Sequence, residues 1–305
     1  MANPNGQPEP TGQPAHDPVG RHPRPEFPAQ SQEHPGTGAA MRPQPDHGEE
    51  SYRGSGRLLG RGAIVTGGDS GIGRAVAIAF AREGADVLIS HLPEEEKDAV
   101  DTVRLIEEAG RVGMAVAGDI REEAHCRSLV DRALTAFGRL DIVVNNAAYQ
   151  MARPGGIEEI STEQLDRVFK TNVYAMFWLC QAAVPHLRPG SSIINTTSIQ
   201  AYQPSPPLLD YASTKGAIVT FTKGLSEQLA PRGIRVNAVA PGPVWTPLIP
   251  ATMPEESVKS FGGSTVFGRP AQPAELAPAY VFLASEEAQF VTAEIMNLTG
   301  GQPLP

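Results

Sequence analysis

The sequence predicts an α/β fold in which helices cover both faces of one doubly wound, Rossmann-type parallel sheet of about seven strands. Two observations favour this fold. Short apolar runs alternate along the chain with longer segments whose apolar residues recur at helical spacing. A glycine-rich turn joins the first apolar run to the first helical segment. Strand, helix and strand in succession require right-handed crossovers, and these produce a parallel sheet.

The predicted strands are short, rich in aliphatic residues and bounded by glycine or polar residues, as buried parallel strands are. They cover residues 61–66, 86–90, 112–117, 141–145, 192–196, 234–239 and 294–298. Helical spacing predicts helices over 71–83, 94–109, 121–137, 161 to about 187, and 211–229. Gly84, Gly110 and Gly138 stand where helix-ending glycines belong, and Ser161 begins a capping box.

Residues 1–57 are predicted to form a proline-rich arm that precedes one domain at 58–305. Eleven of the 29 prolines and four of the seven histidines lie in residues 1–50, where aliphatic residues are almost absent. Burial of so little apolar surface would not offset the conformational entropy that the arm loses on ordering. We therefore expect the arm to be extended or disordered. An arm that lies along a neighbouring subunit is the alternative. The four histidines fit no metal-ligand spacing and are expected to be solvated: His16, His22, His34 and His47.

Composition narrows the class of protein. Hydrophobic residues make up 40% of the 305 residues and charged residues 19%, which is typical of a chain that builds a core. The net charge of −9 argues against a nucleic-acid partner. No apolar run approaches the roughly 18 residues of a membrane helix, and no secretory signal is visible, so a cytoplasmic protein without a membrane partner is expected. Cys126 and Cys180 are expected to be core thiols.

The first chemical motif is the turn from Thr66 to Gly73, TGGDSGIG, between the first predicted strand and the first predicted helix. Gly67 permits the tight turn, Gly71 lets a phosphate approach the backbone, and Gly73 lets the helix pack close to the sheet. A dinucleotide pyrophosphate would bind at this helix N-terminus. An ordinary strand-to-helix loop is the alternative.

The second motif is Tyr211-Ala-Ser-Thr-Lys215, in which residues four apart share one helix face. A lysine ammonium beside a tyrosine hydroxyl favours the phenolate and should lower the tyrosine pKa from about 10 toward neutrality. Such a tyrosine can exchange a proton with an alcohol or carbonyl oxygen. Ser198 directly follows the fifth predicted strand, so it should reach the same crevice. A surface Tyr–Lys pair is the alternative.

These motifs occur in order with Asp119-Ile120, Asn145 to Ala148, Asn172 and the segment 241–246. Their order and spacing resemble the short-chain dehydrogenase/reductase family over about residues 58–301. The arm, the glycine turn and the segment SHLPEEE also resemble a bacterial subgroup of stress-associated oxidoreductases with a proline-rich extension.

The resemblance implies an NAD(P)-dependent oxidoreductase that needs no metal and acts on a small alcohol, polyol, aldehyde or ketone. It implies that Tyr211 is the general acid/base and that Lys215 lowers the Tyr211 pKa and holds the nicotinamide ribose. Ser198 would bind the substrate oxygen, and Asn172 would support a proton-relaying water. It also implies a homotetramer or homodimer built on the helices that begin at 161 and 211.

The resemblance assigns the cofactor to the glycine turn and the strand ends, with Asp119 and Ile120 beside adenine and Val244 and Thr246 at the carboxamide. The full set is Gly67, Asp69, Ser70, Gly71, Ile72, Gly73, His91, Asp119, Ile120, Asn145, Ala147, Tyr211, Lys215, Pro241, Gly242, Val244 and Thr246. Asn146 either contributes here or ties the sheet to the first helix.

The expected cofactor is NAD, with NADP as the alternative. His91 stands after the second predicted strand, where an acid often binds the ribose 2′-hydroxyl. Asp69-Ser70 offers no base to a 2′-phosphate, and Glu94 to Glu96 would repel it. Arg74 is the candidate partner if a phosphate is bound.

The expected substrate contacts combine polar and apolar walls, and each aromatic among them could equally be ordinary packing. They are Ser198, Gln200, Tyr202 and Trp245, with Tyr149, Gln150 and Leu208 as further candidates. Residues 247–268 are expected to form a lid. Two other functions stay open: a nucleotide-binding sensor or scaffold without turnover, and an NADPH-dependent 3-oxoacyl reductase. The complete catalytic set weighs against the first, and the net charge of −9 does not suit the acidic carrier of the second.

Overall fold

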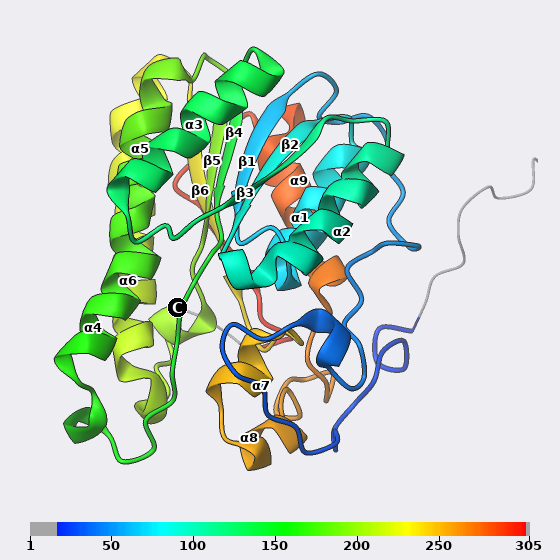
Figure 1. Ribbon diagram of the computed structural model, residues 1–305, viewed down its shortest axis with the longest axis vertical. Helices are drawn as coiled ribbons and strands as arrows, with labels where there is room; N and C mark the ends of the chain where they lie inside the picture. Colours follow the sequence, from blue (N-terminus) through cyan, green and yellow to red (C-terminus); the bar gives the residue numbers. More distant parts are fainter. Residues whose placement is uncertain (1–16, 303–305) are drawn as a thin grey trace, which may run out of the picture.

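The computed structural model describes residues 17–302 and contains one fully parallel, seven-stranded sheet in the order β3-β2-β1-β4-β5-β6-β7 (Figure 1). The strands are β1 (Gly62–Thr66), β2 (Asp86–His91), β3 (Gly113–Ala117), β4 (Ile142–Asn145), β5 (Ser192–Thr196), β6 (Arg235–Pro241) and β7 (Ile295–Leu298). All seven predicted strands are present, with ends shifted by one or two residues. The predicted doubly wound α/β fold is confirmed.

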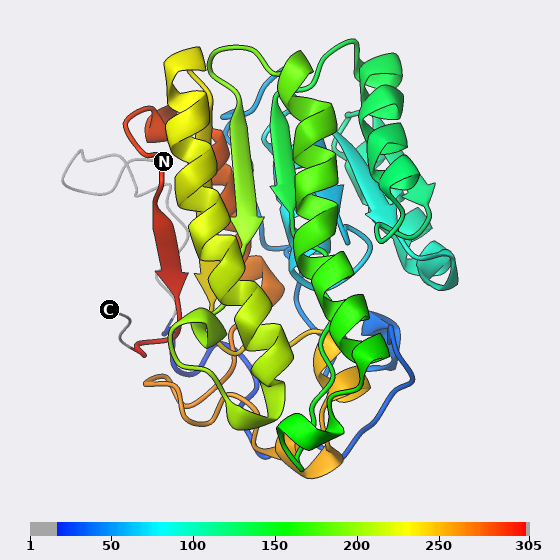
Figure 2. The same cartoon turned by 90° about the vertical axis from the view of Figure 1, so that its left-hand side faces the viewer.

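Helices cover both faces of this sheet. One face carries α1 (Gly71–Arg82), α2 (Glu96–Glu108) and α9 (Pro273–Ala284). Figure 2 shows the opposite face, which carries α3 (Glu123–Phe137), α4 (Thr162–Phe169), α5 (Ala175–Ala183) and α6 (Leu209–Leu229). Within residues 17–302, no helix has the length and apolar character needed to cross a bilayer. Because all strands are parallel, their carboxyl ends meet at one edge, where a ligand site is expected.

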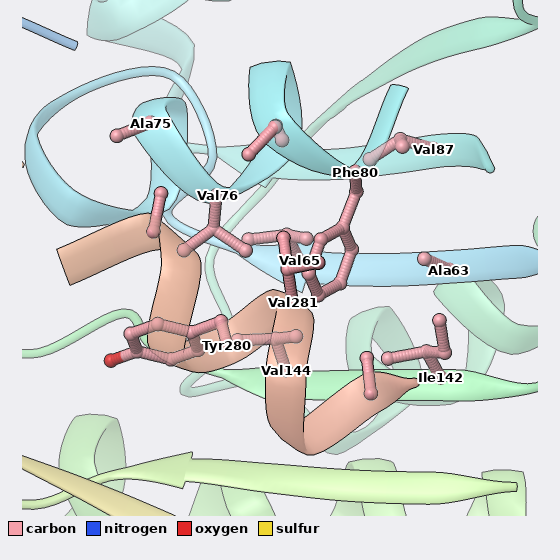
Figure 3. Close-up of a cluster of buried hydrophobic side chains, with 14 of the residues drawn as sticks. Ala63, Val65, Ala75, Val76, Phe80, Val87, Ile142, Val144, Tyr280 and Val281 are labelled. Atoms are coloured by element: carbon pink, nitrogen blue, oxygen red, sulfur yellow. The ribbon is translucent and has the colours of Figure 1, made fainter. Parts of the chain in front are cut away.

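The core between the sheet and the α1–α9 layer explains the continuous apolar runs in the sequence. Phe80, Tyr280 and Val281 pack against Val65 and Val144, and all five side chains are fully buried (Figure 3). Central strands of a parallel sheet are covered on both faces, so they do not alternate between apolar and polar residues.

Two helical segments differ from the prediction. The segment expected as one helix from 161 to about 187 consists of α4, a π turn at Lys170–Tyr174, and α5. The sequence pattern does not predict α9, because Pro273 and Pro278 are usually signals that end a helix. Pro273 occupies the first helical position, where no amide donor is needed, and Gln272 and Glu275 form a capping box there.

Residues 17–57 are extended, as one of the two expectations for the arm has it, and they lie against the domain with some apolar side chains buried. Phe27 and Met41 are buried in a small cluster with Trp245. The ring of Phe27 and the flexible thioether of Met41 provide the apolar surface that the few aliphatic residues of the arm do not. His22 and His47 have largely buried side chains rather than solvated ones. Residues 1–16, with His16, lie outside the described residues, and the boundary at 57/58 stays a prediction.

Glu83, just after α1, fastens the C-terminal end of the arm. Its buried carboxylate accepts hydrogen bonds from Tyr52 Oη at 2.6 Å, Ser55 N at 2.8 Å and Arg57 Nη2 at 2.7 Å. Burial alone would raise the pKa of Glu83, but the hydrogen bonds from Arg57 and Tyr52 outweigh it and hold the pKa at about 2. The ionised carboxylate therefore stabilises the folded chain.

Replacing Glu83 by glutamine should lower the free energy of unfolding at pH 7 by about 3 kcal/mol, because Arg57 and Tyr52 lose a charged acceptor. A depressed carboxyl pKa stabilises the fold above the unfolded value of 4.5, and this stabilisation is lost as the pH falls toward about 2. The difference between wild type and variant should therefore shrink at pH 3. Urea unfolding at both pH values measures it, and an equal difference at pH 7 and pH 3 would contradict this account.

Candidate active site

A pocket of about 340 Å³ opens at the carboxyl edge of the sheet. It lies beside the point where the strand order reverses between β1 and β4. Its lining comes from the glycine turn, the segments after β2 to β6, the start of α6, and the segment of α7 (Leu248–Thr252) and α8 (Glu255–Lys259). Segments that are far apart in the sequence therefore meet in a single cavity.

The glycine turn forms one end of the pocket. Gly67 and Gly71 have φ angles of 62° and 51°, in the left-handed region that favours glycine. A Cβ on Gly67 would lie 3.1 Å from Ala147 Cα, and one on Gly71 would lie 3.1 Å from Thr246 Cγ2. The cradle leaves no room for side chains and presents the N-terminus of α1, which fits a dinucleotide pyrophosphate.

The two asparagines after β4 have different positions. Asn146 lines the pocket, its Nδ2 donates to Thr66 O at 3.0 Å, and its backbone N–H donates to Thr66 Oγ1 at 2.9 Å. It therefore ties the glycine turn to the end of β4. Asn145, predicted to line the cofactor site, is buried within the sheet and donates to Asn195 Oδ1 at 2.8 Å. Successive strand residues point to opposite faces, so only the asparagine beyond the strand reaches the pocket.

Ser198, Tyr211 and Lys215 meet in the same pocket. Helix α6 presents Tyr211 and Lys215 one turn apart, with Lys215 Nζ 5.2 Å from the centroid of the Tyr211 ring. Lys215 Nζ donates to Thr196 O at 2.8 Å, which holds it against the end of β5. Ser198 follows β5 and caps the short helix Ile199–Ala201, where its Oγ accepts from the Gln200 N–H. The three side chains are nearly inaccessible to solvent.

Burial controls the proton equilibria of this trio. Burial raises the pKa of Tyr211 to about 12, and a hydrogen bond with Ser198 opposes that shift. Burial lowers the pKa of Lys215 to about 7. The predicted fall of the Tyr211 pKa is therefore absent in this structure, because loss of solvation outweighs the neighbouring lysine. Lys215 is instead the member of the trio whose pKa lies near neutrality.

Asn172 lies in the π turn and is a positioning group. Its Oδ1 accepts from Tyr149 N at 2.7 Å, and its Nδ2 donates to Tyr149 O at 2.9 Å and to Thr214 Oγ1 at 3.0 Å. These bonds hold the segment after β4 against α6. A π turn is frequent at functional sites. The implied support of a proton-relaying water stays a prediction.

Asp69, His91 and Glu95 line the end of the pocket beside β2. Asp69 is 1% exposed, and its Oδ2 has no hydrogen-bond partner among the described residues. Burial raises the pKa of both carboxyls, and the charge of Asp69 raises that of Glu95 further. Arg74, the candidate phosphate partner, pairs instead with Asp101 and Glu49 outside the pocket. This end of the pocket therefore presents carboxyl groups, and the Arg74 guanidinium is not available there to bind a phosphate.

The expected substrate wall is only partly assembled here. Gln200, Tyr149, Gln150 and Leu208 line the pocket, whereas Tyr202 and Trp245 lie outside it. Trp245 is fully buried under the arm, with its ring 4.2 Å from that of Phe27 and its Nε1 donating to Pro43 O at 2.8 Å. Tyr202 packs beside β6 and β7. Gly73 is also outside the lining, and it packs so closely against the glycine turn that a Cβ there would lie 1.9 Å from Gly67 O.

The sequence prediction misses several pocket residues, among them His34 and Pro35 of the arm and Arg167 of α4. His34 is therefore not a solvated tail residue. Arg167 and Thr171 are one turn apart on one helix face, and both line the pocket. The four-residue spacing between Arg167 and Thr171 indicates a shared helix face, and the predicted site residue Asn172 directly follows Thr171, so the sequence contained a signal for both residues. No local pattern places the arm residues, since the contact joins distant parts of the chain.

A nucleotide cradle at the switch point of a parallel sheet, beside a buried Ser–Tyr–Lys trio, defines a dinucleotide-dependent oxidoreductase. A family model described as enoyl-(acyl carrier protein) reductase matches residues 67–302. The chain belongs to the short-chain dehydrogenase/reductase family, as its motifs predict.

Relatives extend over most of the chain. It is 53% identical to the uncharacterized oxidoreductase YghA of Escherichia coli, over 94% of this chain and 98% of that protein. General stress protein 39 of Bacillus subtilis is 49% identical over 90% of this chain and 96% of its own length. Glucose and ribitol dehydrogenase of Daucus carota is 48% identical, over 90% and 97% respectively. The predicted likeness to stress-associated bacterial oxidoreductases is confirmed.

Solved structures share the fold. A short-chain dehydrogenase from Burkholderia cenocepacia in complex with NADP has a TM-score of 0.75 and 33% identity, covering 80% of this chain and 98% of that one. The 3-ketoacyl-(acyl-carrier-protein) reductase from Brucella melitensis, complexed with NADH, has a TM-score of 0.71 and 34% identity over the same shares. Both nicotinamide dinucleotides are therefore represented among structures of this fold.

Proposed function

We propose that this protein transfers hydride between a nicotinamide cofactor, NAD in preference to NADP, and a small alcohol or polyol or the corresponding aldehyde or ketone. The observation that carries the proposal is the meeting of Ser198, Tyr211 and Lys215 in a pocket that also contains the glycine turn. The bound cofactor supplies the hydride chemistry, and the protein supplies orientation and proton transfer.

Each member of the trio has a separate task at the substrate oxygen. Tyr211 Oη gives a proton to the carbonyl oxygen in reduction and takes one from the alcohol in oxidation. The Ser198 hydroxyl donates a hydrogen bond to the same oxygen, where negative charge develops. Lys215, when protonated, stabilises the phenolate form of Tyr211. Their burial keeps bulk water away from the transferred proton.

The preference for NAD rests on Asp69 and Glu95. The unpartnered Asp69 Oδ2 is an acceptor suited to a ribose hydroxyl, whereas a 2′-phosphate beside two carboxyls would be repelled. The raised pKa values mean that this repulsion grows as the pH rises and the carboxyls lose protons. Cofactor selection should therefore depend on pH.

Fluorescence titrations should give a lower Kd for NADH than for NADPH, and the ratio of the two Kd values should increase about tenfold between pH 6 and pH 9. Asp69→Asn should reduce both the preference and its pH dependence. Glu107→Gln, a change at an exposed carboxyl of α2 outside the lining, is the matched control. A lower Kd for NADPH at both pH values would contradict the proposal.

A polyol substrate is supported by the name of the glucose and ribitol dehydrogenase relative and by the pocket residues Gln150 and Gln200. Oxidation of ribitol and glucose with NAD tests it. The second candidate is 3-oxoacyl reduction, which the Brucella melitensis neighbour favours by its title. Faster reduction of an acetoacetyl thioester with NADPH than oxidation of any polyol would select that candidate.

Assembly and location stay predictions. A homotetramer or homodimer would use the helices after 161 and 211, and the side chains of Leu165, Tyr174 and Phe177 there are exposed and apolar. Such side chains suit an interface between copies of the chain.

A further inference from the structure

Residues 27–47 of the arm, here called the strap, are attached on two sides of the pocket. On one side, Phe27 N–H donates to Lys259 O and Gln32 N–H donates to Pro250 O, each at 2.9 Å, so the strap is bonded to α7 and α8. On the other side, Gly38 N–H donates to Asp98 Oδ2 in α2 at 3.4 Å. In Figure 1 the strap, in blue, runs beside α7 and α8 at the end of the molecule where the strand arrows terminate.

The strap and the expected lid share one apolar cluster. Phe27 and Met41 pack with Trp245, Ile249 and Val258, and Met253 and Phe261 adjoin them. Ile249, Met253 and Phe261 also line the pocket. The lid segment is therefore packed between the pocket and the strap, and its outward movement requires this cluster to separate.

Between its attachments, the strap enters the wall of the pocket at His34 and Pro35. The edge of the His34 ring meets the Tyr149 ring, with centroids 5.0 Å apart. Arg167 Nη2 lies 3.3 Å from His34 Nδ1, and its guanidinium carbon lies 4.1 Å from the Tyr149 ring centroid. A guanidinium can only donate, so His34 Nδ1 is the acceptor. His34 is thereby locked to two residues of the domain.

The groups around His34 keep its ring neutral. Burial, together with the charges of Arg167 and Arg121, lowers the pKa of His34 to about 4, and Glu94 opposes this shift. Glu94 follows β2 and Arg121 follows β3. The adenosine half of a dinucleotide binds at these strand ends in this fold. His34 is therefore a neutral group at neutral pH, and the strap that carries it reaches this half of the pocket through its hydrogen bond to Asp98 in α2.

We propose that the strap completes the nucleotide pocket and controls nucleotide exchange. His34 and Pro35 form the outer wall of the pocket, and the contacts of Phe27 and Met41 with the domain must break before nucleotide leaves. This inference rests on the proposed function, because it takes the ligand of the pocket to be a nicotinamide nucleotide. The strap thus acts on the rate at which nucleotide leaves, and Tyr211 acts on the chemical step.

Stopped-flow displacement of NADH from the full chain tests the strap. Phe27→Ala removes the ring that stacks on Trp245, and His34→Ala removes the wall, so each should raise the NADH dissociation rate about tenfold, with a much smaller change in association. Val19→Ala is the control, since Val19 lies in the same arm ahead of the strap and is exposed. It should dissociate NADH at the wild-type rate.

A second measurement uses the wild type alone and does not depend on how the variants fold. Hydrogen exchange at the amides of Phe27 and Gln32 should slow when NADH binds, because nucleotide and strap hold each other in place. If the wild type binds and turns over NADH but both variants keep the wild-type dissociation rate, the proposed role of the strap is wrong and the proposed function stands. Unchanged exchange at these amides would have the same meaning. Failure of the wild type to bind either NADH or NADPH would overturn the proposed function and the strap together.

Discussion

Replacing Tyr211 by phenylalanine should lower kcat for carbonyl reduction about 10³-fold and change the Kd of NADH by less than about twofold. The substitution removes only the hydroxyl that exchanges the proton, and the buried ring beside Lys215 is retained. Single-turnover measurements with enzyme and NADH in excess isolate the chemical step from nucleotide release. A large loss of rate with intact binding is the expected signature of a general acid.

Tyr202→Phe provides the matched control, because Tyr202 lies outside the pocket. It should keep the wild-type rate. In alcohol oxidation the wild-type rate should rise with pH, since the tyrosine–lysine pair must first lose a proton, and Tyr211→Phe should lose that dependence. Wild-type turnover in Tyr211→Phe would refute the acid/base role. Nucleotide binding without turnover of any carbonyl by the wild type would favour a sensor or scaffold.

Replacing Gly73 by alanine should raise the Kd of NADH about 100-fold. A Cβ at this position would lie 1.9 Å from Gly67 O and 2.6 Å from Asn146 Nδ2. The first contact is with backbone, so the glycine turn itself must move, and overpacking of this kind typically costs about 1–3 kcal/mol. Fluorescence titration with NADH measures the loss, and circular dichroism reports whether the domain stays folded.

Gly224→Ala is the control for Gly73→Ala. Gly224 lies in α6, outside the pocket, and a Cβ there would meet nothing within 4 Å. Alanine in a helix interior is favoured over glycine by roughly 0.5–1 kcal/mol, so this variant should be at least as stable as the wild type. An unchanged Kd in Gly73→Ala would show that the turn does not hold the nucleotide.

The prediction of elements was most successful where local patterns are decisive. All seven strands follow from short apolar runs bounded by glycine or polar residues, and the central strands, which are buried on both faces, tolerate few polar residues. Helix α9 has a weaker local signal, since Pro278 in its interior opposes a helix, and the capping box at Gln272 and packing against α1 and the sheet compensate. The π turn at Asn172 is equally invisible to a helical periodicity of 3.6 residues.

The residues of the candidate site likewise fall into those that local spacing predicts and those that it does not. Ser198, Tyr211, Lys215 and the glycine turn are placed by spacing within single elements, and the structure brings them into one pocket. Trp245 shows the limit of this reasoning. A tryptophan near a predicted active site is as compatible with packing as with substrate contact, and the arm decides between the two by covering it.

The sequence by itself determined the parallel α/β fold, the family, the glycine cradle and the Ser–Tyr–Lys trio, because each depends on periodicity or on residues a few positions apart. The tertiary structure alone decided that burial dominates the pKa values of Tyr211 and Lys215, that Asp69 and Glu95 lie together in the pocket, and that the arm supplies His34 to its wall. Desolvation and contacts between distant segments depend on how the whole chain packs, and no local spacing contains that information.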